Sequence, residues 1–522
     1  MKASEALGPV EGMRLDELAR EIPGGASIVG DGSVRVVGVH HDSRAVGRGD
    51  LFVAKKGARA DGARFVDDAL ARGAVALLQA RGGGAARVPA IEVDDVQTGL
   101  AFAAAAVYGH PSFSLEVVGV TGTNGKTTAT HLIRAAIDGA IGVGARCGTI
   151  GTVGHRFGDL TIDAEHTTPE ADEIARVMAA MRKRGASHVA MEVSSHALAQ
   201  RRVRAVRFRV AAFTNLTQDH LDFHGTMEEY AAAKALLFTD LDPGAAVVNV
   251  DDPFGAKLVA MVKAPLVRVS ARVGADADVA PIAATMSADG IDATLRTPVG
   301  EARVRSRLVG AHNLENIVVA IGVVHALELD VARAAAALAG EVGAPGRLER
   351  CDGPGDDVTV LVDYAHTPDA LARVLASVRG FAKRRVWCVF GCGGDRDKAK
   401  RGPMGEAAAR GADALVVTND NPRTEDPAAI AAAVCDGVRA TGTSEATLAS
   451  LAGGAPGFVV ELDRARAIDA AVRSASAGDV VVLAGKGHED YQIVGAEKRH
   501  LDDREEAKRA LAARRAMHGG SR

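Results

Sequence analysis

A glycine-rich segment that joins an apolar run to a helix constrains the fold of this chain more than any other feature. The apolar run covers residues 115–120, a helix is predicted over 129–137, and the loop between them is Gly122-Thr123-Asn124-Gly125-Lys126-Thr127-Thr128. A strand, a glycine loop and a helix N-terminus in this order present backbone N–H groups to phosphate oxygens. The segment therefore predicts an α/β fold that binds a nucleotide phosphate.

The side chains of this loop predict the phosphates of a nucleotide and Mg²⁺ as ligands. Lys126 would reach the β- and γ-phosphates, and the Thr127 hydroxyl would bind Mg²⁺. The strict consensus has glycine where this chain has Val120, so a glycine-rich turn with a chance Lys-Thr pair is the alternative. We expect every loop residue from Gly122 to Thr128 to contribute to ATP binding.

Chain length suggests three domains. At 522 residues the chain is too long for one compact core. Linker-like sequences at 110–112 and 343–346 predict domains over 1–113, 114–343 and 344–522. Each is expected to alternate strands with helices, the pattern of a sheet covered by helices.

Short apolar runs predict the strands of the last domain, over 358–362, 386–390, 414–417 and 480–484. Ligands of open α/β sheets bind beyond the carboxyl ends of strands, so the polar residues after these runs are candidate binding residues. Residues 278–308 alternate apolar and polar residues over shorter runs, which indicates a small antiparallel patch.

Charge and cysteine usage argue against several classes of protein. The net charge of -4 shows no basic excess, so we expect no nucleic-acid partner. No run approaches the ~18 apolar residues that span a bilayer, and the N-terminus does not resemble a signal peptide, so no membrane insertion is expected. The five cysteines are scattered and odd in number, which favours free thiols in the cytoplasm.

Polar residues after two predicted strands are candidate metal ligands. Residues 189–192 form a strand that ends in Glu192, which we expect to lie near the phosphate loop, although a surface glutamate is the alternative. A second apolar strand runs into a polar cluster with Asp219, His220 and Asp222, one of which could bind metal. A lone histidine is more often a structural hydrogen-bonding residue.

Two further motifs resemble the Mur ligase family, whose members join amino acids to the nucleotide-linked peptide precursor of bacterial peptidoglycan. They are Asp420-Asn421-Pro422-Arg423 and Gly393-Gly394-Asp395-Arg396-Asp397-Lys398, supported by the run over 484–492. They resemble the branch that adds meso-diaminopimelate to UDP-N-acetylmuramoyl-L-alanyl-D-glutamate. The resemblance implies a small N-terminal α/β uridine-nucleotide-binding domain, a central P-loop domain with a parallel sheet, and a C-terminal Rossmann-like domain.

The resemblance implies catalytic roles for four residues. Lys126, Glu192 and His220 match the family's phosphate-binding lysine and its two metal-site residues. Lys234 lies in a predicted helix and on its own would be a solvated lysine, but it matches the lysine that is N-carboxylated in the family. Carbamylation replaces an ammonium by an acidic oxygen ligand, which hard Mg²⁺ prefers. The implied metal site is Thr127, Glu192, His220 and carbamylated Lys234.

The same resemblance extends the two nucleotide sites. For ATP it implies Asn316, together with Arg347 and Asp363 from the third domain, whose closure would complete the site. For the precursor UDP-N-acetylmuramoyl-L-alanyl-D-glutamate it implies a uridine contact by Ser43. The positions implied to contact the muramoyl-peptide are Thr167, Thr168, Ser194, Gln200 and Arg202.

The distal end of meso-diaminopimelate carries a carboxylate and an ammonium, which predicts the chemistry of its pocket. Arg396 and Arg423 can each bind a carboxylate through paired hydrogen bonds. Asp420 and Glu489 can accept hydrogen bonds from the ammonium. L-Lysine lacks the distal carboxylate, and leaving an arginine unpaired would cost on the order of 3–5 kcal/mol. The remaining positions implied for the pocket are Asn421, Pro422 and Gly485.

The predicted reaction is an ATP-dependent amide-bond ligation by a monomeric enzyme. The γ-phosphoryl group passes to the D-glutamyl carboxylate while Lys126 and Mg²⁺ neutralise its charge, and the diaminopimelate amine then attacks the acyl phosphate. Three alternatives stay open. They are a related ligase that adds L-lysine, a folylpolyglutamate-type ligase, and a nucleotide switch that hydrolyses ATP to change shape.

Overall fold

The computed structural model describes residues 7–8, 10–57, 61–83, 87–287, 289–341 and 343–519. The described residues fall into two compact units. The first lies within residues 1–281, 295–302 and 315–337, and the second within 282–294, 303–314 and 338–522. Among the described residues, every helix is too short or too polar to span a bilayer. All five cysteines are free.

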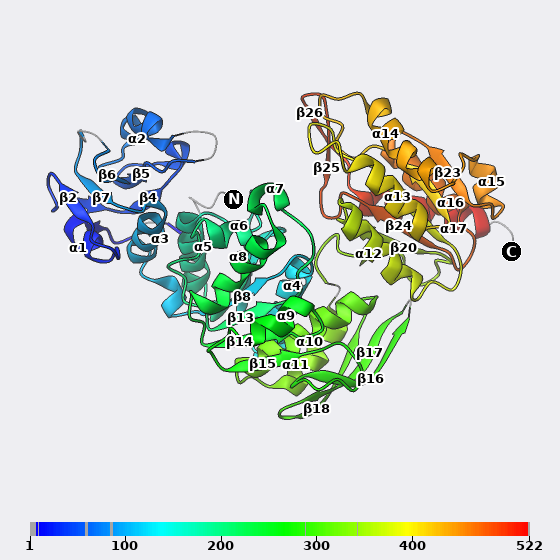
Figure 1. The fold of residues 1–522 in the computed structure, drawn as a ribbon, viewed down its shortest axis with the longest axis horizontal. Helices are drawn as coiled ribbons and strands as arrows, with labels where there is room; N and C mark the ends of the chain where they lie inside the picture. Colours follow the sequence, from blue (N-terminus) through cyan, green and yellow to red (C-terminus); the bar gives the residue numbers. More distant parts are fainter. Residues whose placement is uncertain are drawn as a thin grey trace. The chain divides into compact units, whose positions relative to one another are not determined.

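The N-terminal part of the first unit is a five-stranded sheet, drawn in blue in Figure 1, with the order β2-β7-β6-β5-β4. Its strands are β2 (Ser27–Val29), β4 (Gly38–His40), β5 (Asp50–Val53), β6 (Ala76–Ala80) and β7 (Ala90–Val93). Its helices are α1 (Leu15–Arg20), α2 (Val66–Arg72) and α3 (Val96–Val107), and a two-stranded ribbon pairs β1 (Met13–Arg14) with β3 (Arg35–Val36). Only β2 runs antiparallel to its neighbour, which agrees with the predicted small α/β unit.

An eight-stranded sheet with the order β11-β10-β9-β12-β8-β13-β14-β15 follows in the first unit. Its strands are β8 (Glu116–Thr121), β9 (Cys147–Gly151), β10 (Gly154–Phe157), β11 (Leu160–Ile162), β12 (His188–Glu192), β13 (Val210–Phe213), β14 (Ala245–Asn249) and β15 (Leu266–Val269). All neighbours pair in parallel except β10 and β11, which form an antiparallel edge. The parallel sheet predicted for this part of the chain is therefore present.

The helices of this part are α4 (Lys126–Ile141), α5 (Ala171–Lys183), α6 (Ser195–Ala199), α7 (Leu221–His224), α8 (Met227–Thr239), α9 (Pro253–Val259), α10 (Ala311–Ala326) and α11 (Val331–Ala337). A separate three-stranded sheet has the order β16-β17-β18, with strands β16 (Ala280–Ser287), β17 (Gly290–Thr297) and β18 (Gly300–Ser306). It lies where the shorter alternating runs indicated a change of pattern.

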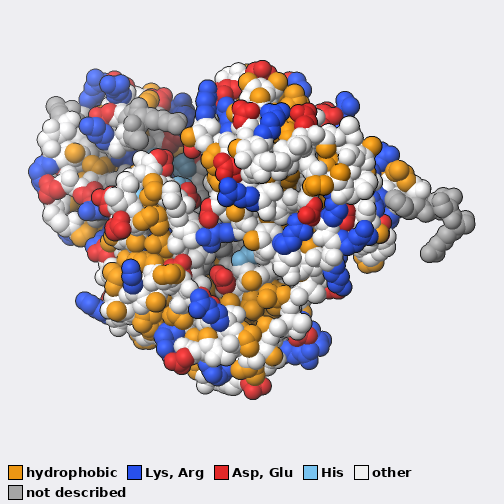
Figure 2. Space-filling view, turned by 45° about the vertical axis from the view of Figure 1, so that its right-hand side comes forward, with side chains coloured by type: hydrophobic (Ala, Val, Ile, Leu, Met, Phe, Trp, Pro, Cys, Tyr) orange, Lys and Arg blue, Asp and Glu red, His pale blue; other side chains and the backbone are white. Residues whose placement is uncertain are grey.

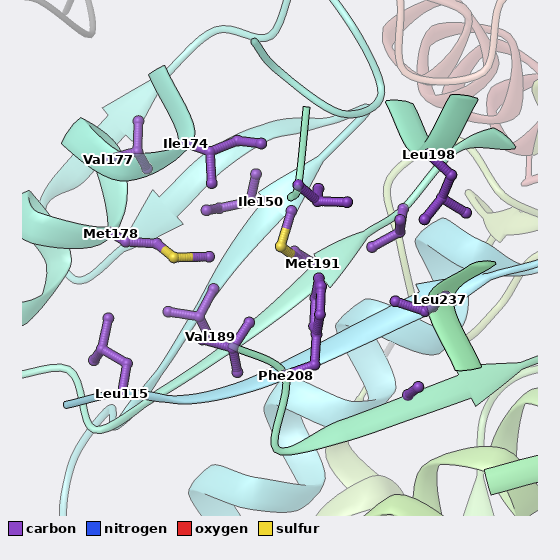
Figure 3. Close-up of a cluster of buried hydrophobic side chains, with 14 of the residues drawn as sticks. Leu115, Ile150, Ile174, Val177, Met178, Val189, Met191, Leu198, Phe208 and Leu237 are labelled. Atoms are coloured by element: carbon purple, nitrogen blue, oxygen red, sulfur yellow. The ribbon is translucent and has the colours of Figure 1, made fainter. Parts of the chain in front are cut away.

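Apolar side chains from the eight-stranded sheet and its helices form one core, shown in Figure 3. Val189 and Met191 of β12 meet Ile174 and Met178 of α5 in it. Burying such a side chain contributes roughly 1.5–3 kcal/mol. Gly119 in β8 leaves room for this packing, because a Cβ there would lie 2.6 Å from the Phe208 ring.

The second unit contains a six-stranded sheet of order β19-β20-β24-β21-β22-β23, parallel except at β19. Its strands are β19 (Glu349–Arg350), β20 (Thr359–Asp363), β21 (Val386–Phe390), β22 (Ala414–Val417), β23 (Gly457–Val460) and β24 (Val480–Ala484). Its helices are α12 (Pro368–Arg379), α13 (Arg401–Gly411), α14 (Pro427–Ala440), α15 (Leu448–Ala452), α16 (Arg464–Ser474) and α17 (Asp503–Gly519). A hairpin pairs β25 (Tyr491–Val494) with β26 (Glu497–His500).

A buried ion pair between Arg464 and Asp503 joins α17 to the residues at the carboxyl ends of strands β22 and β24 in the second unit. Arg464 donates to both carboxylate oxygens of Asp503 at 2.7 and 2.6 Å, and both side chains are fully buried. The same guanidinium donates to the carbonyl oxygens of Asn419 and Ala484. These residues immediately precede Asp420 and Gly485, so the pair fixes the start of two segments predicted to bind the amino acid.

Replacing Arg464 by methionine should lower the free energy of unfolding by about 3–5 kcal/mol, because Asp503 would stay buried without a partner. Urea unfolding measures the change. The double variant Arg464→Met with Asp503→Leu should recover much of it, since an apolar pair leaves no unpaired charge. Equal losses in the single and double variants would contradict this account of the ion pair.

Candidate functional site

The predicted phosphate loop connects β8 to α4 and has no room for side chains at two of its glycines. Gly125 precedes the helix with a φ of 85°, in the left-handed region. A Cβ at Gly125 would lie 2.5 Å from Asn316 Oδ1, and one at Gly122 would lie 1.9 Å from Thr214 Oγ1. Thr128 is buried in the first turn of α4. The loop is thus packed between the residues after β13 and Asn316 of α10.

The residues after β13 hold this loop through hydrogen bonds. Asn124 donates its N–H to the Asn215 side chain at 2.9 Å and accepts from Thr214 Oγ1 at 2.7 Å. Thr123 donates its N–H to Asn215 O at 2.8 Å, and its hydroxyl oxygen accepts from Thr217 N at 3.0 Å. A loop fixed in this way loses little freedom when its N–H groups bind phosphate.

Two lysines converge on one carbonyl oxygen of the loop. Lys126 Nζ donates to Gly122 O and to Thr123 O, both at 2.9 Å, and Lys234 Nζ donates to Gly122 O at 2.8 Å. Lys234 is 1% exposed and lies 4.4 Å from the centre of the Tyr230 ring. Burial, and then the charge of Lys126, lower the pKa of Lys234 well below its ordinary value. The interpretation of Lys234 as a solvated helix lysine is therefore wrong.

Glu192 ends β12 against the phosphate loop, as its sequence pattern predicted. Its carboxylate accepts from Thr127 Oγ1 at 2.9 Å, from Thr152 N at 2.7 Å and from Thr152 Oγ1 at 3.2 Å. The side chain is almost fully buried. Sequence reasoning missed Thr152, whose only signal was its position directly after an apolar strand.

His220 lies at the start of α7 with a φ of 54°, and its ring is about half exposed. Its Nε2 is 3.4 Å from Asp219 Oδ2, and its ring contacts those of His196 and Tyr230. Burial lowers the pKa of His220, and the charges of Lys126 and Lys234 act in the same direction. A neutral imidazole is the form that binds a metal ion.

The residues around the loop fit Mg²⁺ through oxygen donors. Thr127 Oγ1 and Glu192 Oε2 are 2.9 Å apart. Two ligands at right angles and ~2.1 Å from Mg²⁺ would be separated by about 3 Å. Among the described residues, no group of three or more His, Cys, Asp or Glu could hold a metal ion. The predicted metal ligands do not form such a group, because only Glu192 and His220 are of these residue types. The other two are the Thr127 hydroxyl and carbamylated Lys234.

The residues predicted for the muramoyl-peptide form one network beside Glu192. Thr168 Oγ1 donates to Glu192 O at 2.9 Å and accepts from Ser194 N at 2.9 Å. Arg202 donates to Thr168 O at 2.8 Å and to Gln200 Oε1 at 2.7 and 3.1 Å. Thr167 joins the network through Thr152 Oγ1 at 3.2 Å.

A buried carboxylate that sequence reasoning missed joins this network to the N-terminal sheet. Glu170 is 3.1 Å from Arg202 Nη2 and 2.7 Å from Lys55 Nζ, and all three side chains are mostly buried. Ser43, the predicted uridine contact, lies in a short 3-10 helix over Ser43–Ala45 and hydrogen-bonds with Asp68. Ser43 therefore lies in a segment that packs against α2.

The second unit contains the other two residues predicted for ATP, Arg347 and Asp363. Arg347 lies just before β19, and Asp363 is the last residue of β20. Asp363 ends β20, and its carboxylate accepts from Leu348 N at 2.7 Å and Ala365 N at 2.8 Å. Burial raises the pKa of Asp363, and Arg347 partly offsets this. The Arg347 guanidinium stacks on Tyr364 at 4.7 Å, and its buried Nε has no hydrogen-bond partner among the described residues.

The residues predicted for diaminopimelate, with the exception of Arg396, lie close together in the segments that follow β22 and β24. Asn421 donates to Glu489 Oε2 at 3.0 Å, and Gln492 donates to Asp420 O at 2.8 Å. Gly485, with a φ of 118°, passes beside the Asp420 side chain. Arg396 is exposed and makes no hydrogen bond or ion pair with another described residue.

Arg423 has a φ of 52°, which is unusual for a residue with a side chain. A β-bridge to the hairpin holds this conformation, since Arg423 N donates to Ile493 O at 3.0 Å and Gly495 N donates to Arg423 O at 2.7 Å. The guanidinium donates to Gly394 O at 2.8 Å. A Cβ at Gly394 would lie 1.9 Å from Pro422 O, so the two predicted motifs pack directly against each other.

Comparison with known proteins assigns the chain to a family. Residues 35–108 match the Mur ligase family, catalytic domain, residues 120–324 the Mur ligase middle domain, and residues 346–487 the Mur ligase, glutamate ligase domain. The UDP-N-acetylmuramoyl-L-alanyl-D-glutamate--2,6-diaminopimelate ligase of Gloeobacter violaceus is 48% identical over 487 residues, which are 92% of this chain and 95% of that protein.

The ligase of the same name from Geobacter metallireducens is 47% identical over 513 residues, covering 96% of this chain and 98% of its own length. A solved structure of a UDP-N-acetylmuramoyl-L-alanyl-D-glutamate--2,6-diaminopimelate ligase matches with a TM-score of 0.69 and 31% identity, covering 96% of this chain and 99% of that chain. The chain belongs to the Mur ligase family. The resemblance and the three-domain α/β fold class predicted from the sequence are confirmed.

Proposed function

We propose that the chain is an ATP-dependent, ADP-forming ligase that adds meso-2,6-diaminopimelate to UDP-N-acetylmuramoyl-L-alanyl-D-glutamate in peptidoglycan synthesis. Two relatives with this activity in their names align with more than nine-tenths of the chain. The observation that supports the proposal best is the line of hydrogen bonds from Thr127 through Glu192 to Thr168. It joins the phosphate loop to residues predicted to bind the precursor.

The residues of the first unit suit the activation of a carboxylate. The loop N–H groups and Lys126 would bind the phosphates of ATP, and Thr168, Ser194 and Arg202 would orient the precursor. Transfer of the γ-phosphoryl group to the D-glutamyl carboxylate forms an acyl phosphate and ADP. The anionic carboxylate thereby gains phosphate as a leaving group.

Mg²⁺ is part of this proposal. When bound, it would neutralise charge on the phosphoryl oxygens during transfer. Thr127, Glu192 and His220 would hold it, with Lys234 as a fourth ligand after carbamylation. A neutral amine is needed for that modification, and the lowered pKa of Lys234 favours the neutral form. Its N–C bond forms with CO₂ and one proton leaves the nitrogen.

The second unit supplies a pocket for the amine substrate. Asp420 and Glu489 would accept hydrogen bonds from the distal ammonium, and Arg423 would bind the distal carboxylate. The amine at the other end then attacks the acyl carbon, and phosphate leaves. We further propose that the enzyme works as a monomer in the cytoplasm, where its five free cysteines stay reduced.

Replacing Arg423 by alanine should raise the KM for diaminopimelate about 100-fold and leave the KM for ATP nearly unchanged, because only the distal carboxylate loses its partner. Steady-state kinetics with each substrate varied in turn measures the effect. Arg410, an exposed arginine of α13, provides the control substitution Arg410→Ala. An Arg423→Ala variant with the parent KM for diaminopimelate would remove Arg423 from the pocket.

Phosphate release from ATP tests the proposed reaction against a nucleotide switch. The proposal predicts rapid release only when the UDP-muramoyl-dipeptide and diaminopimelate are both present. Release that is indifferent to the muramoyl precursor would favour the switch. A folylpolyglutamate-type ligase would instead require a folate and glutamate, which provide a separate arm of the same assay.

A further inference from the structure

We propose that Lys486 is a positioning residue of the amino-acid site, where its buried ammonium sets the charge that the site presents to an incoming zwitterion. Lys486 lies directly after Gly485, at the end of β24. The proposal rests on the proposed function, since it concerns the pocket for the amine substrate. Neither motif spacing nor the predicted contacts gave this lysine a role.

The Lys486 ammonium lies at the centre of the predicted pocket residues. Its Nζ is 3.3 Å from Glu489 Oε2, 3.4 Å from Asn421 Oδ1 and 3.6 Å from Asp420 Oδ1. The side chain is fully buried, with its Nζ also 5.4 Å from the centre of the Tyr491 ring. A buried ammonium of this kind is stable only while its acceptors stay in place. Lys486 therefore fixes three of the residues expected to contact the diamino acid.

The charges of this cluster explain why a lysine is needed there. Asp420 and Glu489 bring two negative charges, and Lys486 neutralises one of them. One negative charge remains for the ammonium of the ligand, and Arg423 faces the ligand's carboxylate with the opposite sign. The site as a whole is then matched to an α-amino acid end with one ammonium and one carboxylate. Without Lys486 the two carboxylates would repel each other and turn apart.

Lys486 also lies on a loop whose other side packs on the residues predicted for ATP. A Cβ at Gly487 would lie 2.6 Å from Tyr364 Cβ, and one at Gly346 would lie 2.1 Å from His488 N. Gly485 N donates to Asp363 O at 3.0 Å. The loop is thus packed between two surfaces of the second unit, which holds the backbone that carries Lys486 in place.

The test compares Lys486→Met with Lys498→Met in the full-length protein. Lys498 also lies over the Tyr491 ring, at 3.9 Å, but on the exposed strand β26, so it controls for loss of a lysine beside that ring. Lys486→Met should raise the KM for diaminopimelate on the order of 100-fold, with kcat and the KM values for ATP and the muramoyl precursor little changed. Lys498→Met should behave like the parent protein.

A second variant covers the case in which Lys486→Met does not fold. Lys486→Met combined with Glu489→Gln removes one charge of each sign and should fold, with thermal unfolding as the check. Its kcat/KM for diaminopimelate should be at least that of Glu489→Gln alone, because removing Lys486 as well leaves one negative charge, that of Asp420, to face the ligand. A double variant that folds but has a much lower kcat/KM than Glu489→Gln alone, or a Lys486→Met variant with an unchanged KM, overturns the role of Lys486.

The same experiment separates this inference from the proposed function. Parent protein that forms no product from diaminopimelate would end the proposed function, whatever the variants do. Parent protein that forms the product, together with a Lys486→Met variant whose losses fall equally on all three substrates, would leave the function standing. It would show that Lys486 serves only the stability of the fold.

Discussion

Replacing Lys234 by alanine is expected to lower kcat on the order of 1,000-fold, because the reaction would lose a charged group at the phosphoryl-transfer site. The lysine is buried beside Lys126, and both donate to the same carbonyl oxygen of Gly122. Two ammonium groups repel each other there, whereas a carbamate at Lys234 would attract Lys126 and Mg²⁺. The substitution removes this carbamate and leaves a small cavity against Tyr230.

Short carboxylic acids such as acetate or formate should partly restore the activity of Lys234→Ala, because they can bring an oxygen ligand into that cavity. Lys257→Ala, in the exposed part of α9, is the matched control and should retain full activity. Parent protein equilibrated with ¹³C-labelled bicarbonate should show a carbamate carbon by NMR, and the variant should not. A fully active Lys234→Ala protein would rule out the carbamate.

Glu192→Gln should have the second largest effect, a fall in kcat of about 100- to 1,000-fold. Glutamine keeps the shape of the side chain. Its oxygen can still accept from Thr152 N, and its amide nitrogen can donate to the hydroxyls of Thr127 and Thr152, so the fold should survive. It removes the negative charge that Mg²⁺ requires, and the Mg²⁺ concentration at half-maximal rate should therefore rise. Titration of the rate with Mg²⁺ measures both effects together.

The control for Glu192→Gln is Glu116→Gln, which changes an exposed carboxylate at the start of the neighbouring strand β8. It should leave the rate and the Mg²⁺ dependence unchanged. A Glu192→Gln protein with the parent Mg²⁺ dependence would show that Glu192 is only a structural acceptor for Thr127 and Thr152. The metal would then have to be bound elsewhere.

Much of the fold could be predicted because its strands are buried on both faces and therefore appear as continuous apolar runs. The runs over 386–390, 414–417 and 480–484 coincide with β21, β22 and β24. Helix ends were less accurate. Helix α4 begins at Lys126 rather than at residue 129, because Gly125 takes the left-handed conformation and lets the Lys-Thr pair enter the first turn.

Burial of charged residues was the main feature that the sequence could not reveal. Alanines surround Lys234 in α8, so no apolar stripe marks which face of the helix is buried. Lys486 stands between two glycines, where the local pattern indicates a loop and gives no sign of its buried ammonium. Thr152 and Glu170 belong to the site because they contact residues far away in the sequence, Glu192 for Thr152 and Lys55 and Arg202 for Glu170. Motif spacing does not predict such contacts.

The predicted site residues form two groups, one in each unit, so the proposed roles of the two groups can be tested separately. The phosphate loop and the residues predicted for the muramoyl-peptide lie around Glu192 in the first unit, and residues predicted for the amine lie around Lys486 in the second. Basic and acidic side chains are interspersed on the face shown in Figure 2. Substitutions around Lys486 should change the KM for the amine and spare the KM values for ATP and the precursor.

The identity of the amine that the enzyme adds distinguishes the proposed ligase from one that adds L-lysine. Protein supplied with ATP, Mg²⁺ and UDP-N-acetylmuramoyl-L-alanyl-D-glutamate, together with equal concentrations of meso-diaminopimelate and L-lysine, yields a product whose mass identifies the amino acid. We expect the diaminopimelate adduct in large excess, because L-lysine leaves Arg423 without a carboxylate. A lysine adduct as the main product would contradict it.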